Sequence, residues 1–269
     1  MSTTTLTRPA RTTASSAHTV TAVRVLRSEW HKFWTIRSTW ITLLASALLI
    51  LGLGLLVAAN YDSGSREFVD PLGVGLAGAQ LAQISLPILG VLMIAGEYTT
   101  GMIHSTLTAV PKRVPILWSK AAVLAGIVFP LTFLTSLLTY PLAQRFLAGT
   151  DQEAALTDPG VLGAITGLSV GITALSVFAL GLGAVLRSVA GGITAFVGGI
   201  MILPEVVSMI PVDAVDTAVE YFPVQAAGNI GTLDGFAGAP SPLASFIALT
   251  LWALGSVAVA AYFLKRRDV

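Results

Sequence analysis

The sequence contains no cysteine, and only 11% of its 269 residues are charged. Without cysteine the chain has no disulfide, no thiol nucleophile and no thiolate metal site. A soluble domain carries roughly 25% charged residues, whereas 54% of this chain is hydrophobic. Most of its surface is therefore expected to lie in a membrane rather than in water.

Sequence motifs for catalysis are also missing. The chain has no Gly-rich phosphate loop ending in Gly-Lys-Ser/Thr and no His-Glu-x-x-His, which are patterns that bind ATP or zinc. It has no Gly-x-Ser-x-Gly elbow either, because the match at 167–171 lies inside a long uncharged interval and not at the strand-to-helix turn that exposes a nucleophilic serine. We therefore expect no catalytic residue, no metal and no cofactor in this chain. It is not expected to be an enzyme by itself, and no nucleic-acid partner is expected.

Long uncharged intervals are what the sequence has instead. A helix that crosses a bilayer needs about 20 apolar residues, and five intervals reach that length alone. The interval 188–204 reaches it if the helix continues past Glu205. Proline removes a helical hydrogen bond, so Pro130 and Pro141 are expected to kink or end the third span, and Pro204 to interrupt the fifth. The predicted spans are 40–60, 73–95, 115–142, 160–186, 189–210 and 242–264.

The positively charged residues gather in every second segment outside the predicted spans, and acidic residues dominate the segments between. All lysines and arginines except Arg66 and Arg145 precede the first span, lie between spans 2 and 3 or 4 and 5, or follow the sixth. The other three connections are acidic. By the positive-inside rule both termini are cytoplasmic. The sequence thus predicts an all-α, six-span integral membrane protein of a multi-pass type. The external connection 211–240 is expected to hold two short helices divided by Pro223.

The first 37 residues fall into two parts. Residues 1–20 are rich in Ser, Thr and Ala and are expected to form a disordered cytoplasmic tail, with an organellar transit peptide as the alternative. The six-span domain occupies 21–269. Residues 22–37 predict an amphipathic elbow helix in the membrane interface, serving as an anchor for span 1, as a contact for a cytoplasmic partner, or both. Its candidate residues are Leu26, Trp30, Lys32, Phe33 and Trp34.

The segment 97–113 between spans 2 and 3 is the most informative part of the chain. It reads as a short cytoplasmic helix with Glu97 at its N-terminus, where an acid is favourable, and with Pro111 at its end. An ordinary interfacial loop helix is the alternative to a docking site for a partner.

A few polar residues lie within or beside the spans. Gln80 and Gln83 share a helical face and either line a pathway or bond to a neighbouring helix. Glu205 either marks a substrate or ion path or sits in water at the outer interface. Lys120 is most simply an interfacial anchor.

Small residues mark the fourth span. Gly163, Gly167 and Gly171 recur at four-residue intervals, a pattern that lets helices approach closely. The face serves either packing within one subunit or a seam between two copies.

Two segments carry a resemblance to a known family. Residues 96–113, GEYTTGMIHSTLTAVPKR, followed by 116–120, ILWSK, resemble the segment after span 2 of the type-2 ABC exporter permeases. Residues 28–40, SEWHKFWTIRSTW, resemble the entry to span 1 in the same family, and the external connection with Tyr-Phe-Pro before span 6 also fits. In its richness in Ala, Gly and Val the sequence is most similar to actinobacterial members of the family. The family often has arginine where this chain has His104.

The resemblance implies a permease subunit in a bacterial plasma membrane. Residues 97–113 would be the coupling helix that docks on a separate ABC ATPase subunit, and 22–37 would be the elbow. The candidate ATPase contacts that the resemblance implies are Glu97, Tyr98, Gly101, Met102, Ile103 and His104. Two ATPase copies would bind ATP and Mg, and a second permease copy or a sibling would complete the path. The cargo would be an exported hydrophobic or amphipathic compound. The alternatives are an ion-coupled secondary carrier or channel acting as a homo-oligomer, and an intramembrane enzyme.

Overall fold

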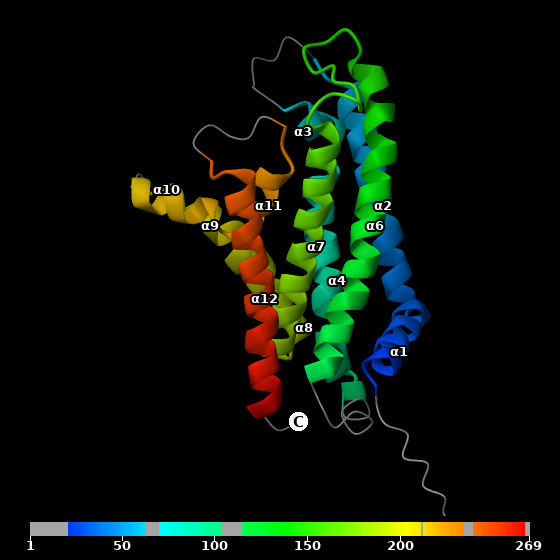
Figure 1. The fold of residues 1–269 in the computed structure, drawn as a ribbon, viewed down its shortest axis with the longest axis vertical. Coiled ribbons are helices and arrows are strands. Elements are labelled where there is room, and N and C mark those ends of the chain that lie inside the picture. The colour runs from blue at the N-terminus through cyan, green and yellow to red at the C-terminus, as the bar shows by residue number, and fades with distance from the viewer. Residues whose placement is uncertain (1–20, 63–69, 104–113, 211, 234–238, 267–269) are drawn as a thin grey trace, which may run out of the picture.

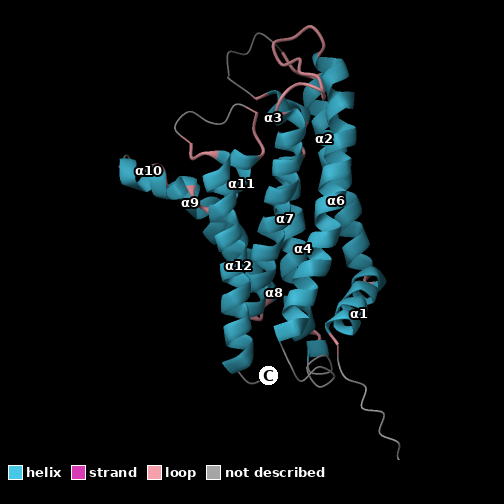
Figure 2. Cartoon of the chain, viewed as in Figure 1, coloured by secondary structure: helices cyan, strands magenta, loops and turns pink. Residues whose placement is uncertain are grey.

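The computed structural model describes residues 21–62, 70–103, 114–210, 212–233 and 239–266, and this part of the chain contains helices and no strand (Figure 2). Six of its helical stretches are long and apolar enough to cross a membrane, which confirms the all-helical, six-span prediction. The tail 1–20 lies outside the described residues. The helices in chain order are α1 Ala22–Thr35, α2 Arg37–Ala59, α3 Pro71–Gly75, α4 Ala79–Thr99, α6 Val114–Leu147, α7 Val161–Leu186, α8 Val189–Thr194, η1 Ala195–Ile202, α9 Leu203–Val207, α10 Asp213–Glu220, α11 Pro223–Ile230 and α12 Pro242–Arg266.

Helix α7 is the centre of the bundle. It packs against α4, α6, α11 and α12, and most of its length is buried, whereas α2 and α12 expose most of theirs. The long helices run roughly side by side along the long axis of the molecule (Figure 1). Because exposed leucines on α2, such as Leu44 and Leu48, are more than half accessible, the outer helices present an apolar surface suited to lipid.

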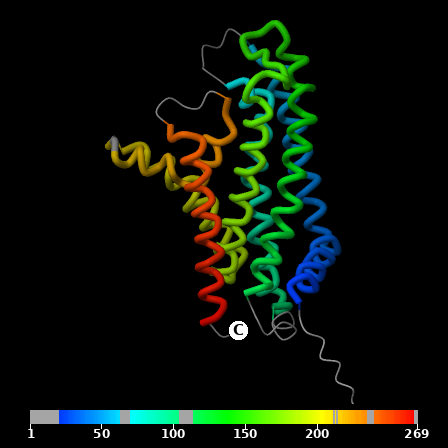
Figure 3. The backbone as a smooth tube through the Cα atoms, viewed as in Figure 1, coloured from blue at the N-terminus to red at the C-terminus, as the bar shows by residue number. Residues whose placement is uncertain are grey.

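The fifth span is the least buried of the six. It is built from α8, the π-helix η1 and α9, and α9 leads away from the bundle toward α10 (Figure 3). Pro204 lies in the first turn of α9. Since proline has no N–H and its ring crowds the carbonyl four residues earlier, the wider π turns fall directly before it. The span is therefore not interrupted at Pro204 but changes its helical winding there.

Two other span boundaries differ from the prediction. Helix α6 runs through Pro130 and Pro141 and ends at Leu147, so Pro141 does not end the third span. Helix α4 continues to Thr99 with Pro87 inside it, beyond the predicted end at residue 95. Membrane helices tolerate internal proline where neighbouring groups satisfy the freed backbone, and apolar residues on both sides favour continuing the span.

The glycines of α7 pack within the chain. A Cβ on Gly167 would lie 2.0 Å from the backbone oxygen of Ile230, and one on Gly171 would lie 3.1 Å from that of Ala227. Both partners belong to α11, whose first residue is Pro223. Gly163 has open space around it. The two inner glycines thus allow α11 to approach α7 closely.

Candidate functional site

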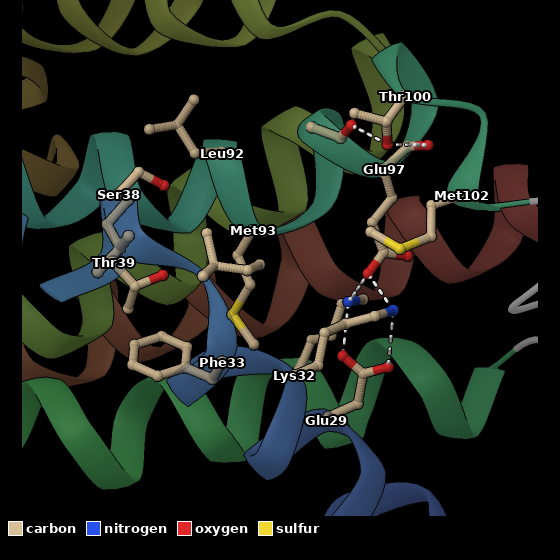
Figure 4. A pocket seen from close by; sticks show the side chains of 14 residues that line it. Glu29, Lys32, Phe33, Ser38, Thr39, Leu92, Met93, Glu97, Thr100 and Met102 are labelled. Carbon is tan, nitrogen blue, oxygen red and sulfur yellow. Dashed lines mark hydrogen bonds and ion pairs between the residues drawn. The ribbon is translucent and has the colours of Figure 1, made fainter.

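Four charged side chains from three helices meet beside one end of the bundle. The Nζ atom of Lys120 on α6 lies 2.6 Å from Glu29 Oε2 on α1 and 2.5 Å from Glu97 Oε1 on α4. Lys32 Nζ on α1 lies 2.6 Å from the same Glu97 oxygen and 3.7 Å from Glu29 Oε1. Figure 4 shows Glu29 and Lys32 facing Glu97. We call these residues the charge cluster.

Three of the four side chains in the charge cluster are almost completely withdrawn from solvent, and the Lys32 side chain is 22% exposed. Lys120 is 0% exposed, Glu29 3% and Glu97 4%. Removing a charge from water costs several kcal/mol per ion, so such groups persist only when they are paired. Two carboxylates here face two ammonium groups, and the charges balance. Within the described residues these three are the buried charges.

The sequence places each member by local structure. Val25, Glu29 and Phe33 repeat every four residues and form the buried stripe of α1, because residues four apart share a helical face. Lys32, one turn after Glu29, sits at the edge of that stripe. Glu97 lies in the last turn of α4 and Lys120 in the second turn of α6. The cluster therefore joins α1 to the helices on either side of the segment 104–113.

Glu97 does not begin a helix, contrary to the sequence interpretation. It lies near the C-terminal end of α4, where the helix dipole disfavours a negative charge. The reason is that the apolar run of span 2 continues as helix through Thr99. Lys32 and Lys120 supply the positive charge that stabilises the Glu97 carboxylate, which the C-terminal end of a helix does not supply.

The remaining residues of the predicted coupling segment have separate positions. Gly101 adopts φ 71° and directly follows the C-cap of α4, a conformation that suits glycine. The Arg187 guanidinium lies 5.3 Å from the ring centre of Tyr98. Met102 is 40% exposed and Ile103 is buried. His104 lies outside the described residues.

The elbow residues divide between two faces of α1. Phe33 is buried and Lys32 joins the charge cluster, whereas Leu26 and Trp30 are exposed. Trp34 packs edge-on against Trp30 and tilted against Trp40 of α2, with ring centres 5.5 and 4.5 Å apart. The face toward the bundle is thus the one that carries Glu29, not the aromatic stripe as a whole.

The predicted pathway residues do not converge. Gln80 and Gln83 line a small cavity of about 190 Å³ between α3, α4, α7 and α11, together with Asp70. Glu205 is exposed on α9 and accepts a hydrogen bond of 2.9 Å from Gln225. The structure therefore brings the two glutamines together and leaves Glu205 apart from them.

Sequence reasoning missed Glu29 and read Lys120 as an anchor. A signal was present in both cases. Glu29 is spaced four residues from Val25 and from Phe33, so it shares their face, and Lys120 directly precedes a long uncharged interval. The sequence does not show that the face of α1 with Glu29 meets the face of α6 with Lys120.

Among the residues that the structure describes, no group of three metal-ligating side chains is arranged to hold a metal ion. No family model and no curated protein matches the chain. The fold of the described residues, with six helices long and apolar enough to cross a membrane, is that expected of a multi-pass membrane protein.

Proposed function

We propose that this chain is the permease subunit of an ATP-driven ABC transporter and that it couples to a separate ATPase subunit through residues 97–113. The single observation that carries the proposal is the charge cluster. It ties α1, α4 and α6 together at both ends of the connection between α4 and α6.

A partner that pushes on this connection needs helices that respond as one unit. Ionic contacts of 2.5–2.6 Å between buried or partly buried groups link the three helices at fixed separations, and buried pairs are costly to break. Helix α4 packs in turn along the central helix α7. Movement at the cluster would thus reach the middle of the bundle, which is how an ATPase would shift the permease between two states.

The charge map supports a cytoplasmic location for this end, because residues 8–37, the connection between α4 and α6, and residues 265–267 together carry most of the cations. The buried charges of the described residues lie in the cluster rather than along a path through the spans. Ion-coupled carriers use intramembrane ionisable groups, so this distribution favours the permease over the carrier. Six spans would form half of a path, completed by a second copy or a sibling and driven by two ATPase subunits. Export of a hydrophobic or amphipathic compound rests on the family resemblance.

The test is association with the ATPase after Met102→Asp. Met102 is 40% exposed beside the cluster, and it avoids the strained φ of Gly101. Met209→Asp is the matched control, because Met209 is 80% exposed and follows α9, away from the end that carries α1 (Figure 1). We expect the Met102 variant to insert normally and lose the ATPase, and the Met209 variant to keep it. Retention by both would refute the docking assignment.

A further inference from the structure

A cavity of about 320 Å³ lies beside the charge cluster, between α1, the start of α2 and the end of α4 (Figure 4). One part of its wall is apolar and is formed by Phe33, Leu89, Leu92 and Met93. The charge cluster forms the other part. The cavity thus has an apolar body and one polar end, the arrangement typical of small-molecule sites.

Glu97 presents an unsatisfied atom at the polar end. Its Oε1 accepts from both Lys32 and Lys120, but its Oε2 is buried and no donor among the described residues reaches it. The side chain is 5% exposed. A buried carboxylate oxygen without a donor is costly, so a donor that reaches Oε2 from the cavity would gain a charge-assisted hydrogen bond.

We propose that this cavity binds a neutral amphiphile whose hydroxyl group donates a hydrogen bond to Glu97 Oε2. Two carboxylates and two ammonium groups already balance in the cluster. A ligand cation would meet the lysines and a ligand anion would meet the glutamates, so a neutral donor is the group that fits. The volume of about 320 Å³ holds on the order of ten groups the size of a water molecule.

The inference does not depend on the transport function, because it rests on the cavity and on Glu97 alone. The same hydroxyl has two possible sources. It is carried either by a free amphiphile or by the glycerol of a neutral lipid such as diacylglycerol. The chemistry at Glu97 is the same for both.

The test measures saturable binding of two labelled isomers, 1-octanol and heptyl methyl ether, to the full chain in phosphatidylcholine nanodiscs. Partition into empty nanodiscs is subtracted. The isomers match in size, but only the alcohol donates. Because a hydrogen bond to a charged acceptor is worth about a factor of ten or more in affinity, we expect 1-octanol to bind about tenfold more tightly. Equal affinities would overturn the proposal and leave a buried water as the partner of Oε2.

Two variants identify the site. Glu97→Gln keeps an oxygen for the lysines and turns an N–H toward the cavity, so the alcohol should lose its advantage over the ether. Leu92→Trp fills the apolar part without touching a charge and should abolish binding of both probes. Leu138→Trp is the control, because Leu138 is an exposed leucine of α6 outside this cavity. Undiminished binding to Leu92→Trp would overturn the assignment.

The source of the hydroxyl is distinguished in the same assay by adding diacylglycerol to the nanodiscs. If a neutral lipid is the natural ligand, diacylglycerol competes and weakens binding of 1-octanol to the wild-type chain. If the ligand is a free amphiphile, the affinity for 1-octanol is unchanged. Both results support a hydroxyl site at Glu97.

Discussion

Lys120 and Glu29 are 91 positions apart in the sequence, and their charged groups lie 2.6 Å apart inside the protein. The pair joins the first helix of the domain to the start of α6. Buried ion pairs are weak evidence for stability, since desolvation offsets much of their attraction. Their effect is geometric, because the contacts that pair all four charges fix how α1, α4 and α6 lie relative to one another.

Lys120→Met should destabilise the protein strongly. The change leaves Glu29 and Glu97 buried with Lys32 as their remaining partner, and breaking a buried pair in this way costs about 3–5 kcal/mol. The measurement is the free energy of unfolding in mixed detergent micelles. Lys265→Met is the control, because Lys265 is exposed near the end of α12 and should change the free energy by less than about 0.5 kcal/mol. Similar effects of the two substitutions would contradict the cluster.

Combining Glu29→Met with Lys120→Met should recover part of the lost stability. Replacing both members of a buried pair with apolar residues is often neutral or stabilising, and Lys32 still faces Glu97 through a 2.6 Å contact. A double-mutant cycle on the unfolding free energy measures this coupling. Additive losses in the double variant would show that the two charges do not interact.

The close approach of α11 to α7 predicts different effects at two glycines. Gly167→Ala places a methyl group 2.0 Å from the Ile230 oxygen, so the backbone must move, at a cost of about 1–3 kcal/mol. Gly163→Ala enters open space and should be neutral or slightly stabilising, because alanine favours helix over glycine. Thermal unfolding of both variants tests this. An equal loss at Gly163 would instead place that residue in a contact with another copy.

Glu205→Gln should leave stability nearly unchanged, within about 0.5 kcal/mol. The carboxylate is exposed and its 2.9 Å partner Gln225 can also bond to an amide oxygen. The unfolding free energy checks this, and Glu97→Gln serves as the buried comparison with a clear loss. A large loss for Glu205→Gln would indicate that this acid is enclosed by another chain.

The spans were predictable from the sequence because a helix that crosses a bilayer excludes charge along its own length. Such a helix is therefore visible as an uncharged interval of the sequence. The starts of α7 and α12 fall within one residue of the predicted positions, and both helices, like the six-span count, follow from uncharged intervals. Proline effects were not predictable in the same way. At Pro141 the neighbouring helices let α6 continue, whereas before Pro204 the chain widens into η1.

The candidate site could be predicted only in part. Glu97 and Lys32 were identified for their place in two amphipathic segments, but Glu29 and Lys120 were not assigned a role together. A buried ion pair depends on which helix faces meet, and that is decided by packing across the chain rather than by spacing within a helix. Of the predicted coupling contacts, His104 lies outside the described residues, and the others stay predictions.

In the proposed transporter, this chain transmits the work of a separate ATPase. The most direct measurement is to purify the full chain from its own membrane together with the proteins it retains, and to assay ATP hydrolysis. The permease proposal predicts a roughly equimolar soluble ATPase and vanadate-sensitive turnover. A chain that is recovered alone and transports a solute along an ion gradient without ATP would contradict it.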